Sequence, residues 1–421
     1  MDLITGVIWF TYALSLYFLI FWLTVYLLRR NDIKEELKDD SDLKRFPLVS
    51  VMVPAYNEEK TIIKTLQSIV NLNYPKEKLE ILVIDDGSKD RTSEIVSKFI
   101  KKNTSYNIKL IIQENAGKAK AMNNGLKIIS GELFACLDAD SFVEKDTLKN
   151  MVRMHLNDSD LAVVTPVMRV DNPKTWIQKF QRVEYIASML VSKLMSYLDC
   201  NYVAPGPFST YKTKIVQAIG GFDEHNLVED QEIAYKIQKA DYRIRQCSNG
   251  FVRTVAPSTV KGLGKQRNRW VKGTLLTIFD YKHMIFNRNY GDFGMFQLPL
   301  TLSAYFLSVM ALVSFCYYLF KPFFLMVKNL YLIGFDFATY FSNWSFSFSI
   351  LDINGFVTLI VYLMLLIGVM MLFFASRMTD DKLREYGFFY MVPYFFVYFI
   401  ILSFITVKVL LELVIGKKQK W

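Results

Sequence analysis

Histidine and the glycine-rich phosphate motifs are scarce or missing in this chain of 421 residues. The three histidines, His155, His225 and His283, do not form a ligand cluster in the sequence, so we do not expect a zinc hydrolase. The four cysteines show no CxxC spacing, which argues against a zinc site and a disulfide framework. Neither GxxxxGK[ST] nor GxGxxG occurs, which excludes a P-loop and a dinucleotide-binding fingerprint.

Charged residues are absent or rare in four long apolar stretches. Hydrophobic residues make up 52% of the chain and aromatic residues 15%, more than a soluble domain normally carries. About 20 consecutive apolar residues are enough to cross a bilayer as a helix. We therefore predict four membrane spans, at residues 4–28, 293–320, 354–376 and 386–407.

Basic residues flank these spans unevenly. Four lie in residues 29–38 and three in 377–384, whereas only Lys321 and Lys328 lie between the second and third spans. Because basic residues favour the cytoplasmic side, we expect residues 29–292 in the cytoplasm and a multi-pass protein of the cell membrane. Four spans would put the tail "GKKQKW" outside, so either the last span does not cross fully or the tail breaks the rule.

The net charge of +10 agrees with this flanking bias and with attraction to anionic lipid. It therefore requires no nucleic-acid partner.

The segment between the first two spans begins with a charged stretch, residues 29–46, which we expect to be a surface tether. Beyond it, short runs rich in β-branched residues alternate with helical stretches, which predicts a doubly wound α/β sheet. Such sheets bind ligands at the carboxyl ends of their strands. The predicted strands are 48–54, 79–86, 108–113, 133–138 and 161–166, and the predicted helices 58–70, 90–101, 118–129 and 145–156.

A polar motif follows each of the first four strands: "PAYNEE", "DDGSKD", "NAGKAKAMNNG" and "DAD". Each has a structural explanation when taken alone. Residues 85–88 could form a turn with an N-cap, Lys118 and Lys120 an exposed helix face, and Asp138 and Asp140 a helix cap. One diphosphate ligand at the common strand edge would explain all four motifs together.

Carboxylates at two places suit transfer of a sugar from a nucleotide. Asp138 and Asp140 point to the same face by strand alternation, and a divalent cation held there would neutralise a leaving diphosphate. Inverting sugar transfer also needs a carboxylate to accept the proton of the attacking hydroxyl. Asp230 is the candidate base, and its alternative role is in a helix N-cap with first-turn acids.

Six motifs occur in order: "VPAYNEE", "DDGS", "DAD", "APGPFSTY", "VED" and "QRNRW". Through them residues 48–290 resemble the family-two inverting glycosyltransferases, specifically the membrane-integrated synthases of hyaluronan, chitin, cellulose and poly-N-acetylglucosamine. The resemblance implies an α/β GT-A type nucleotide-sugar-binding domain inserted between transmembrane helices, with amphipathic interface helices. The expected parts are an N-terminal transmembrane helix (1–28), a charged linker (29–46), a GT-A domain (47–260), a QxxRW segment with an interface helix (261–292) and three C-terminal transmembrane helices (293–421).

The resemblance also implies roles for the matching residues. Asp230 would be the catalytic base, and Asp138 and Asp140 would hold Mg²⁺ or Mn²⁺. Arg269 and Trp270 match the QxxRW pattern of processive enzymes; the guanidinium could bind diphosphate and the indole could stack on the acceptor sugar. The residues expected around the nucleotide are Ala55, Tyr56, Glu58, Asp86, Lys118, Asp138, Gln266 and Arg269. Those expected around the acceptor are Gly206, Pro207, Glu229 and Trp270.

Residues 176–198 and the segment after Trp270 carry apolar residues every three or four positions. We expect both helices to lie in the membrane interface and to floor the active site, with ordinary core helices as the alternative.

These features predict a processive β-glycosyltransferase that polymerises a polysaccharide from a UDP-sugar, one candidate being UDP-GlcNAc, and moves it across the bilayer. Its partners would be the donor, the growing chain and lipid, with an accessory subunit left open. One alternative is a non-processive transferase acting on a polyprenyl-phosphate or lipid acceptor; another is a catalytically silent membrane scaffold. Ala204, Pro205 and Val228 depart from the residues usual in the resembling synthases, so the sugar is left open.

Overall fold

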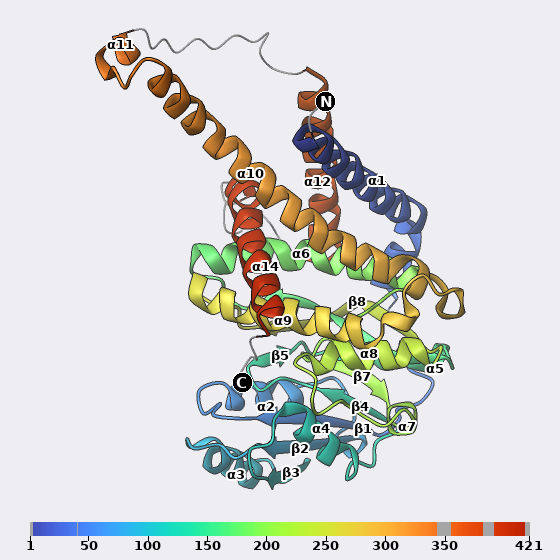
Figure 1. Cartoon of the computed structure of the whole chain (residues 1–421). Helices are drawn as coiled ribbons and strands as arrows, with labels where there is room; N and C mark the ends of the chain where they lie inside the picture. The colour runs from blue at the N-terminus through green and yellow to red at the C-terminus, as the bar shows by residue number, and fades with distance from the viewer. Residues whose placement is uncertain (1–2, 40, 343–354, 382–390, 417–421) are drawn as a thin grey trace.

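An eight-stranded sheet with helices on both faces forms one part of the molecule, and long helices extend away from it (Figure 1). This computed structural model describes residues 3–39, 41–342, 355–381 and 391–416. The expected α/β fold is confirmed.

The sheet has the order β3-β2-β1-β4-β7-β6-β8-β5. All five predicted strands are present, and the first four, β1 to β4, are parallel as expected. The expectation of a doubly wound sheet is wrong beyond β4, because β7 lies antiparallel between β4 and β6. The strands are β1 (Val49–Ala55), β2 (Leu79–Asp85), β3 (Asn107–Ile112), β4 (Leu133–Cys136), β5 (Ser141–Val143), β6 (Leu161–Val170), β7 (Ser209–Lys212) and β8 (Arg243–Thr254).

Side-chain alternation along the strands divides the core into two layers. In β1, Val51 and Val53 pack on one face of the sheet and Met52 packs on the other. Helices α2 (Ile62–Val70), α3 (Thr92–Lys102) and α5 (Thr147–Asn157) cover the valine face. Helices α4 (Lys118–Leu126), α7 (Thr213–Ala218) and α8 (Glu229–Lys239) cover the methionine face. The four predicted helices thus correspond to α2, α3, α4 and α5.

Two long helices, α6 (Trp176–Tyr197) and α9 (Val260–Asp280), lie between the sheet and the long apolar helices (Figure 1). The predicted apolar stripe of α6 is buried in a cluster that also contains Trp22, Leu372 and Leu263. The stripe therefore packs against the apolar helices, while the helix as a whole also contacts the sheet.

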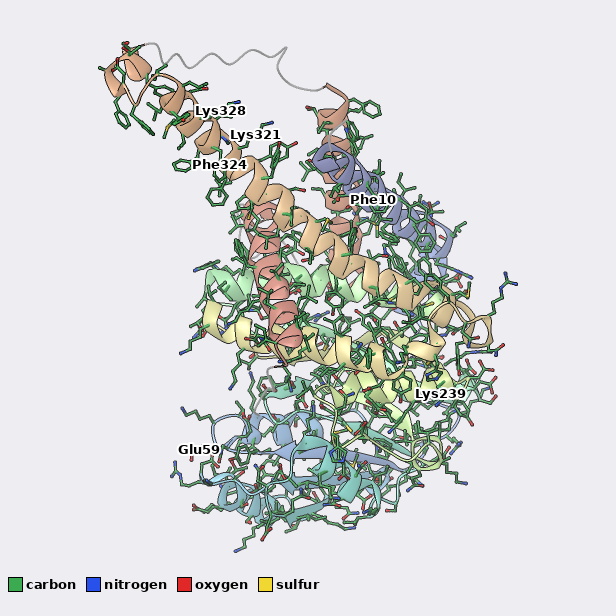
Figure 2. The ribbon with its side chains drawn as sticks, viewed as in Figure 1. Phe10, Glu59, Lys239, Lys321, Phe324 and Lys328 are labelled. Atoms are coloured by element: carbon green, nitrogen blue, oxygen red, sulfur yellow. The ribbon has the colours of Figure 1, made fainter. Side chains whose placement is uncertain are left out.

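Three described helices are long and apolar enough to cross a membrane, and we call them the membrane helices. They are α1 (Leu3–Lys38), α10 (Leu298–Leu332) and α12 (Gly355–Met378). Lys321, Phe324 and Lys328 project from the part of α10 that lies far from the sheet (Figure 2).

The predicted fourth span begins outside the described residues. Its described part contains a π turn at Tyr394–Tyr398 and α14 (Phe399–Val414). Glu412 near the end of α14 accepts a hydrogen bond from Asn268 of α9 at 2.9 Å, so the end of α14 rests on α9.

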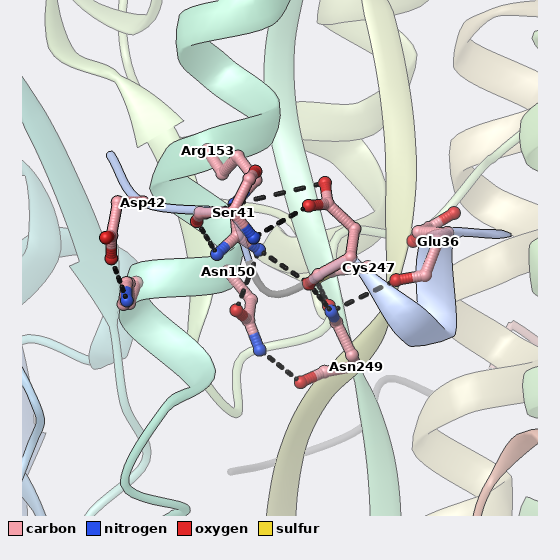
Figure 3. A network of polar contacts seen from close by, with 9 residues as sticks. Glu36, Ser41, Asp42, Asn150, Arg153, Cys247 and Asn249 are labelled. Atoms are coloured by element: carbon pink, nitrogen blue, oxygen red, sulfur yellow. Dashed lines mark hydrogen bonds and ion pairs between the residues drawn. The ribbon is translucent and has the colours of Figure 1, made fainter. Parts of the chain in front are cut away.

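The expectation that residues 29–46 form an unpacked tether is wrong. Helix α1 continues through Arg29 and Arg30 to Lys38. Glu36 in its last turn accepts a 2.7 Å hydrogen bond from the backbone N–H of Ser248 and forms an ion pair with Lys193. Arg153 then donates to the carbonyl oxygens of Asp39 and Ser41 (Figure 3). The charged stretch packs because the folded domain presents opposite charges and backbone groups to it. Membrane helix α1 is therefore fixed to β8.

Glu36→Ala should destabilise the protein by about 3 kcal/mol, because it leaves the nearly buried Lys193 ammonium without its carboxylate. Asp32→Ala is the matched control one turn earlier, since the Arg29–Asp32 pair is about half exposed and should contribute less than about 1 kcal/mol. Thermal unfolding of the detergent-solubilised protein measures both. Equal shifts for the two variants would contradict the anchoring role of Glu36.

Candidate active site

The ammonium of Lys118 joins three separate elements at the carboxyl end of the sheet. Its Nζ lies 2.6 Å from Oδ1 of Asp138 and 2.8 Å from Oε1 of Glu229. Lys118 is the first residue of α4, Asp138 follows β4, and Glu229 is the first residue of α8. The ammonium therefore holds α8 against the strand-end carboxylates. An exposed helix face, the alternative for Lys118, is wrong because its side chain is largely covered.

Asp86 fixes the loop that delivers Lys118. Its carboxylate accepts hydrogen bonds from Gln113 Nε2 at 2.8 Å and from the backbone N–H groups of Ala116 and Gly117 at 2.9 and 2.8 Å. Gly117, the N-cap of α4, has a φ of 92°, a conformation that a residue with a Cβ rarely adopts. Asp86, at the end of β2, thus positions the start of α4. This structural role was not predicted from the sequence.

The first and second strand ends are joined by backbone contacts. The carbonyl oxygen of Ala55 accepts a 2.9 Å hydrogen bond from the N–H of Asp86, and Asn57 donates its N–H to Ser88 Oγ at 2.9 Å. Tyr56 beside them is 44% exposed, so its ring is available to a ligand at this edge. These contacts bring Ala55, Tyr56 and Asp86 together, as the sequence predicts for one binding edge.

Asp138 and Asp140 lie on the turn between β4 and β5. The N–H of Ser141 donates to the carbonyl oxygen of Asp138 at 2.9 Å and closes this turn. Burial raises the pKa of Asp140 to about 6, and the negative charges of Asp138 and Glu58 act in the same direction. The charges of two other carboxylates therefore act on Asp140, and Lys118 is the cation that acts in the opposite direction.

Asp230 lies in the first turn of α8, next to Glu229. Burial raises its pKa to about 6, and the charge of Glu229 contributes, while Lys118 and Arg269 act in the opposite direction. The N-cap of α8 is Val228, so Asp230 is not the cap itself, but Glu229 and Asp230 do lie in the first turn, as the structural alternative predicts. Lys118 and Arg269 thus offset only part of the effect by which burial and Glu229 disfavour the charged form of Asp230.

The "APGPFSTY" segment packs between these groups. A Cβ on Gly206 would lie 2.6 Å from Lys118 Nζ and 2.8 Å from Asp138 Oδ2, so glycine leaves the room that this ion pair needs. The N–H of Ala204 donates to the carbonyl oxygen of Asp230 at 2.9 Å. Gly206 therefore lies beside Lys118 and Asp138, and Pro207 follows it in the chain. Both were expected at the acceptor, but this position also borders the residues expected to bind the donor.

Helix α9 carries the "QRNRW" motif to the same place. The charge of Arg269 acts on both Glu229 and Asp230. Oε1 of Gln266 is buried and has no hydrogen-bond partner among the described residues. Trp270 packs against a small cluster that includes Tyr185.

Helices α8 and α9 approach closely. A Cβ on Gly273 would come within 2.6 Å of Val228, and Thr274 donates to Gln231 at 2.7 Å. Val228 therefore fills a contact with α9. This packing holds the "QRNRW" helix against the helix that carries Asp230.

Sequence reasoning missed Tyr185 of α6. Burial raises its pKa to about 12, and the charges of Arg267, Glu184 and Asp140 also act on it. Tyr185 thus shares a cluster with Trp270 and is close enough to Asp140 for that charge to act on it, although it is not part of the apolar stripe that identified the helix. The neighbours of Tyr185 depend on how α6 packs against the rest of the protein, which the apolar periodicity of the helix does not predict.

Part of the chain matches a known protein family. Residues 50–220 match the family described as glycosyl transferase family 2. The poly-beta-1,6-N-acetyl-D-glucosamine synthase of Staphylococcus aureus (strain COL) is 31% identical over 275 residues, which are 65% of this chain and 66% of that protein. The synthase of the same name from Staphylococcus epidermidis is 29% identical over the same shares. The match thus spans slightly less than two thirds of these relatives.

A solved structure is similar in fold over almost the whole chain. It is the mannosyltransferase PcManGT from Pyrobaculum calidifontis in complex with GDP-Man and Mn²⁺, 20% identical, with a TM-score of 0.59, covering 97% of this chain and all of that one.

Lys118→Met should destabilise the protein by about 3 kcal/mol, because it removes the ion-pair partner of the buried carboxylate of Glu229. Lys120→Met is the matched control, since Lys120 pairs with Glu224 at 3.0 Å on the surface and should contribute less than about 1 kcal/mol. The melting temperatures of the two purified variants test this. A Lys118→Met protein as stable as the control would mean that the ammonium does not hold α8 in place.

Proposed function

Residues 50–220 match glycosyl transferase family 2, and from that premise we propose that the chain is a processive inverting β-glycosyltransferase that polymerises a polysaccharide from a UDP-sugar. The observation that carries the proposal is the Lys118 cluster, which joins the strand-end carboxylates to the helix of Asp230 beneath the "QRNRW" helix. The names of the relatives favour UDP-GlcNAc as the donor.

The residues at the strand ends fit a divalent cation, which we propose to be Mg²⁺ or Mn²⁺. Asp138 and Asp140 supply hard oxygen ligands. The pKa of Asp140 is raised first by burial and then by the negative charges of Asp138 and Glu58, which a cation would offset. Among the described residues no group of three or more His, Cys, Asp or Glu side chains forms a ready-made metal site. That agrees with Mg²⁺, which typically takes one or two carboxylates together with substrate phosphates. When bound, the ion would neutralise charge on the leaving diphosphate.

Asp230 is the proposed base. Its carboxylate accepts the proton of the attacking acceptor hydroxyl, on the face of the sugar opposite the leaving group. A pKa near 6 keeps it charged at neutral pH while bringing its basicity closer to the working pH. Lys118 and Arg269, which both act on Asp230, supply positive charge beside the diphosphate.

Trp270 is proposed to bind the acceptor by stacking on a sugar ring. Its helix, α9, packs on α8 through Thr274 and Gly273, which supports a fixed distance between the acceptor and the base. Gln266, with its unpartnered amide oxygen, is the proposed hydrogen-bond acceptor for donor or acceptor hydroxyls.

We propose that the sheet domain lies in the cytoplasm against the bilayer. The apolar membrane helices and the fixed junction at Glu36 support this placement. The contact of α14 with α9 supports a last apolar segment that does not cross fully, which would leave the basic tail in the cytoplasm.

Product size tests the proposed function. Purified protein in detergent or nanodiscs is incubated with radiolabelled UDP-GlcNAc and other UDP-sugars, with Mg²⁺ or Mn²⁺. A ladder of high-mass polysaccharide is expected. A single lipid-soluble product would favour transfer to a polyprenyl-phosphate or lipid acceptor, and transfer from none of the donors would favour a silent scaffold.

Asp230→Asn should lower kcat by about 10²–10⁴-fold, because the amide does not accept the proton, while UDP affinity stays near that of the parent. Asp223→Asn, in the loop before α8, is the matched control and should retain activity. Steady-state kinetics and calorimetry with UDP measure the two effects. Near-normal turnover of Asp230→Asn would remove Asp230 from the role of base.

A further inference from the structure

A polar cluster behind Trp270 joins three elements that are distant in sequence. Nη2 of Arg267 lies 2.5 Å from Oε2 of Glu184, and the hydroxyl of Tyr398 donates to the same oxygen at 2.7 Å. Arg267 belongs to α9, Glu184 to α6, and Tyr398 to the π turn that precedes α14. One carboxylate oxygen thus connects the "QRNRW" helix, the other interface helix and the C-terminal apolar segment.

The side chains of this cluster are largely buried, which restricts their orientations. Arg267 is 9% exposed and Tyr398 is fully buried, whereas the Glu184 side chain keeps 21% of its surface. A guanidinium removed from water needs a counter-charge, and Glu184 supplies it. The orientation of Arg267 is therefore set by where α6 places Glu184.

Arg267 in turn lies on the indole of Trp270. Its guanidinium carbon is 4.3 Å from the centre of the ring. The two residues are three positions apart on α9 and so share a face of the helix. A cation stacked on an aromatic face at this distance is attracted by the ring quadrupole and restricts the ring's orientation. Tyr185, next to Glu184 on α6, is in the same small cluster as Trp270.

The hydroxyl of Tyr398 is held by aromatic contacts. Its ring stacks on Tyr394 with centroids 5.6 Å apart and lies 5.7 Å from the ring of Phe180. Tyr394 and Tyr398 begin and end a π turn, a local widening that recurs at functional sites in helices. The C-terminal segment therefore presents this hydroxyl to Glu184 in a fixed position.

We infer that Glu184 is a positioning residue for the acceptor: through Arg267 it sets the orientation of the Trp270 ring, and through Tyr398 it links that orientation to the C-terminal apolar segment. This inference rests on the proposed function, in which Trp270 stacks on the acceptor sugar. Glu184 itself touches neither donor nor acceptor in this assignment.

A neighbouring ion pair provides a matched control. Arg182, two residues earlier on α6, donates Nε to Asp381 at 3.2 Å, and both side chains are at least nine-tenths buried. This pair connects α6 to the residues just after α12, on a different part of the protein from the "QRNRW" motif. Asp381→Asn therefore removes a buried ionic contact of α6 while leaving the Arg267–Trp270 contact in place.

The test measures acceptor binding and product length in the full-length protein. The probe is a fluorescently labelled β-1,6-linked N-acetylglucosamine pentasaccharide. Glu184→Gln should weaken its binding by about tenfold and shorten the polymer, with the KM for the UDP-sugar unchanged. In a Trp270→Ala background the same change should alter binding less than twofold, because the ring through which Glu184 acts is gone. Asp381→Asn should lower the melting temperature and leave pentasaccharide affinity unchanged.

Tyr398→Phe removes one hydroxyl donor from the same carboxylate and serves if Glu184→Gln folds poorly. It should weaken pentasaccharide binding in the same direction. The inference is overturned if Glu184→Gln, or Tyr398→Phe in its place, binds the pentasaccharide as tightly as the parent does. It is also overturned if the loss of affinity is equally large in the Trp270→Ala background, or if Asp381→Asn weakens pentasaccharide binding by the same factor. A wild-type protein that binds no pentasaccharide and makes no polymer would instead refute the proposed function.

Discussion

The double ion pair of Lys118 is the interaction on which the rest of the site depends. Its ammonium contacts Asp138 at 2.6 Å and Glu229 at 2.8 Å, and so connects the end of β4 to the start of α8. Without a cation there, the carboxylates of two elements would repel one another in a partly desolvated pocket. Other features serve this contact: Asp86 fixes the loop before Lys118, and Gly206 leaves space for the pair. Binding of a diphosphate with a divalent ion also requires positive and negative charges side by side. This edge of the sheet supplies both, which suits the proposed nucleotide-sugar donor.

The second constraint is attachment to the membrane. Helix α1 does not end at its basic flank but continues into the domain, where Glu36 receives the N–H of Ser248 and the ammonium of Lys193. Helices α6 and α9 then lie between the sheet and the membrane helices, and each carries residues that face the site. The chemistry is thus placed beside the apolar helices by packing and buried charge, in a way that a flexible linker would not allow. Such a placement suits an acceptor that leaves through the bilayer.

Much of the sheet and part of the candidate site could be predicted from local pattern. The apolar runs of β1, β2 and β4 are buried on both faces, as parallel strands require. The carboxyl ends of β2, β3 and β4 indicated the edge of the sheet where Asp86, Lys118 and Asp138 lie. Strand β7 was missed because it is short and follows Gly206 and Pro207, which read as a loop. The Arg267 cluster was missed for another reason: its contacts join residues 83 and 214 positions apart, and no periodicity encodes such pairs.

We propose that the strand-end aspartates and Asp230, the proposed base on α8, face one shared ligand. The most direct measurement is the position of Mn²⁺, by anomalous scattering from crystals of the full-length protein grown with UDP and Mn²⁺. We expect one strong peak within about 2–2.5 Å of an Asp140 oxygen and of the diphosphate, with Asp230 facing the same cavity. A peak bound elsewhere, or UDP in a cavity that Asp230 does not face, would contradict this proposal.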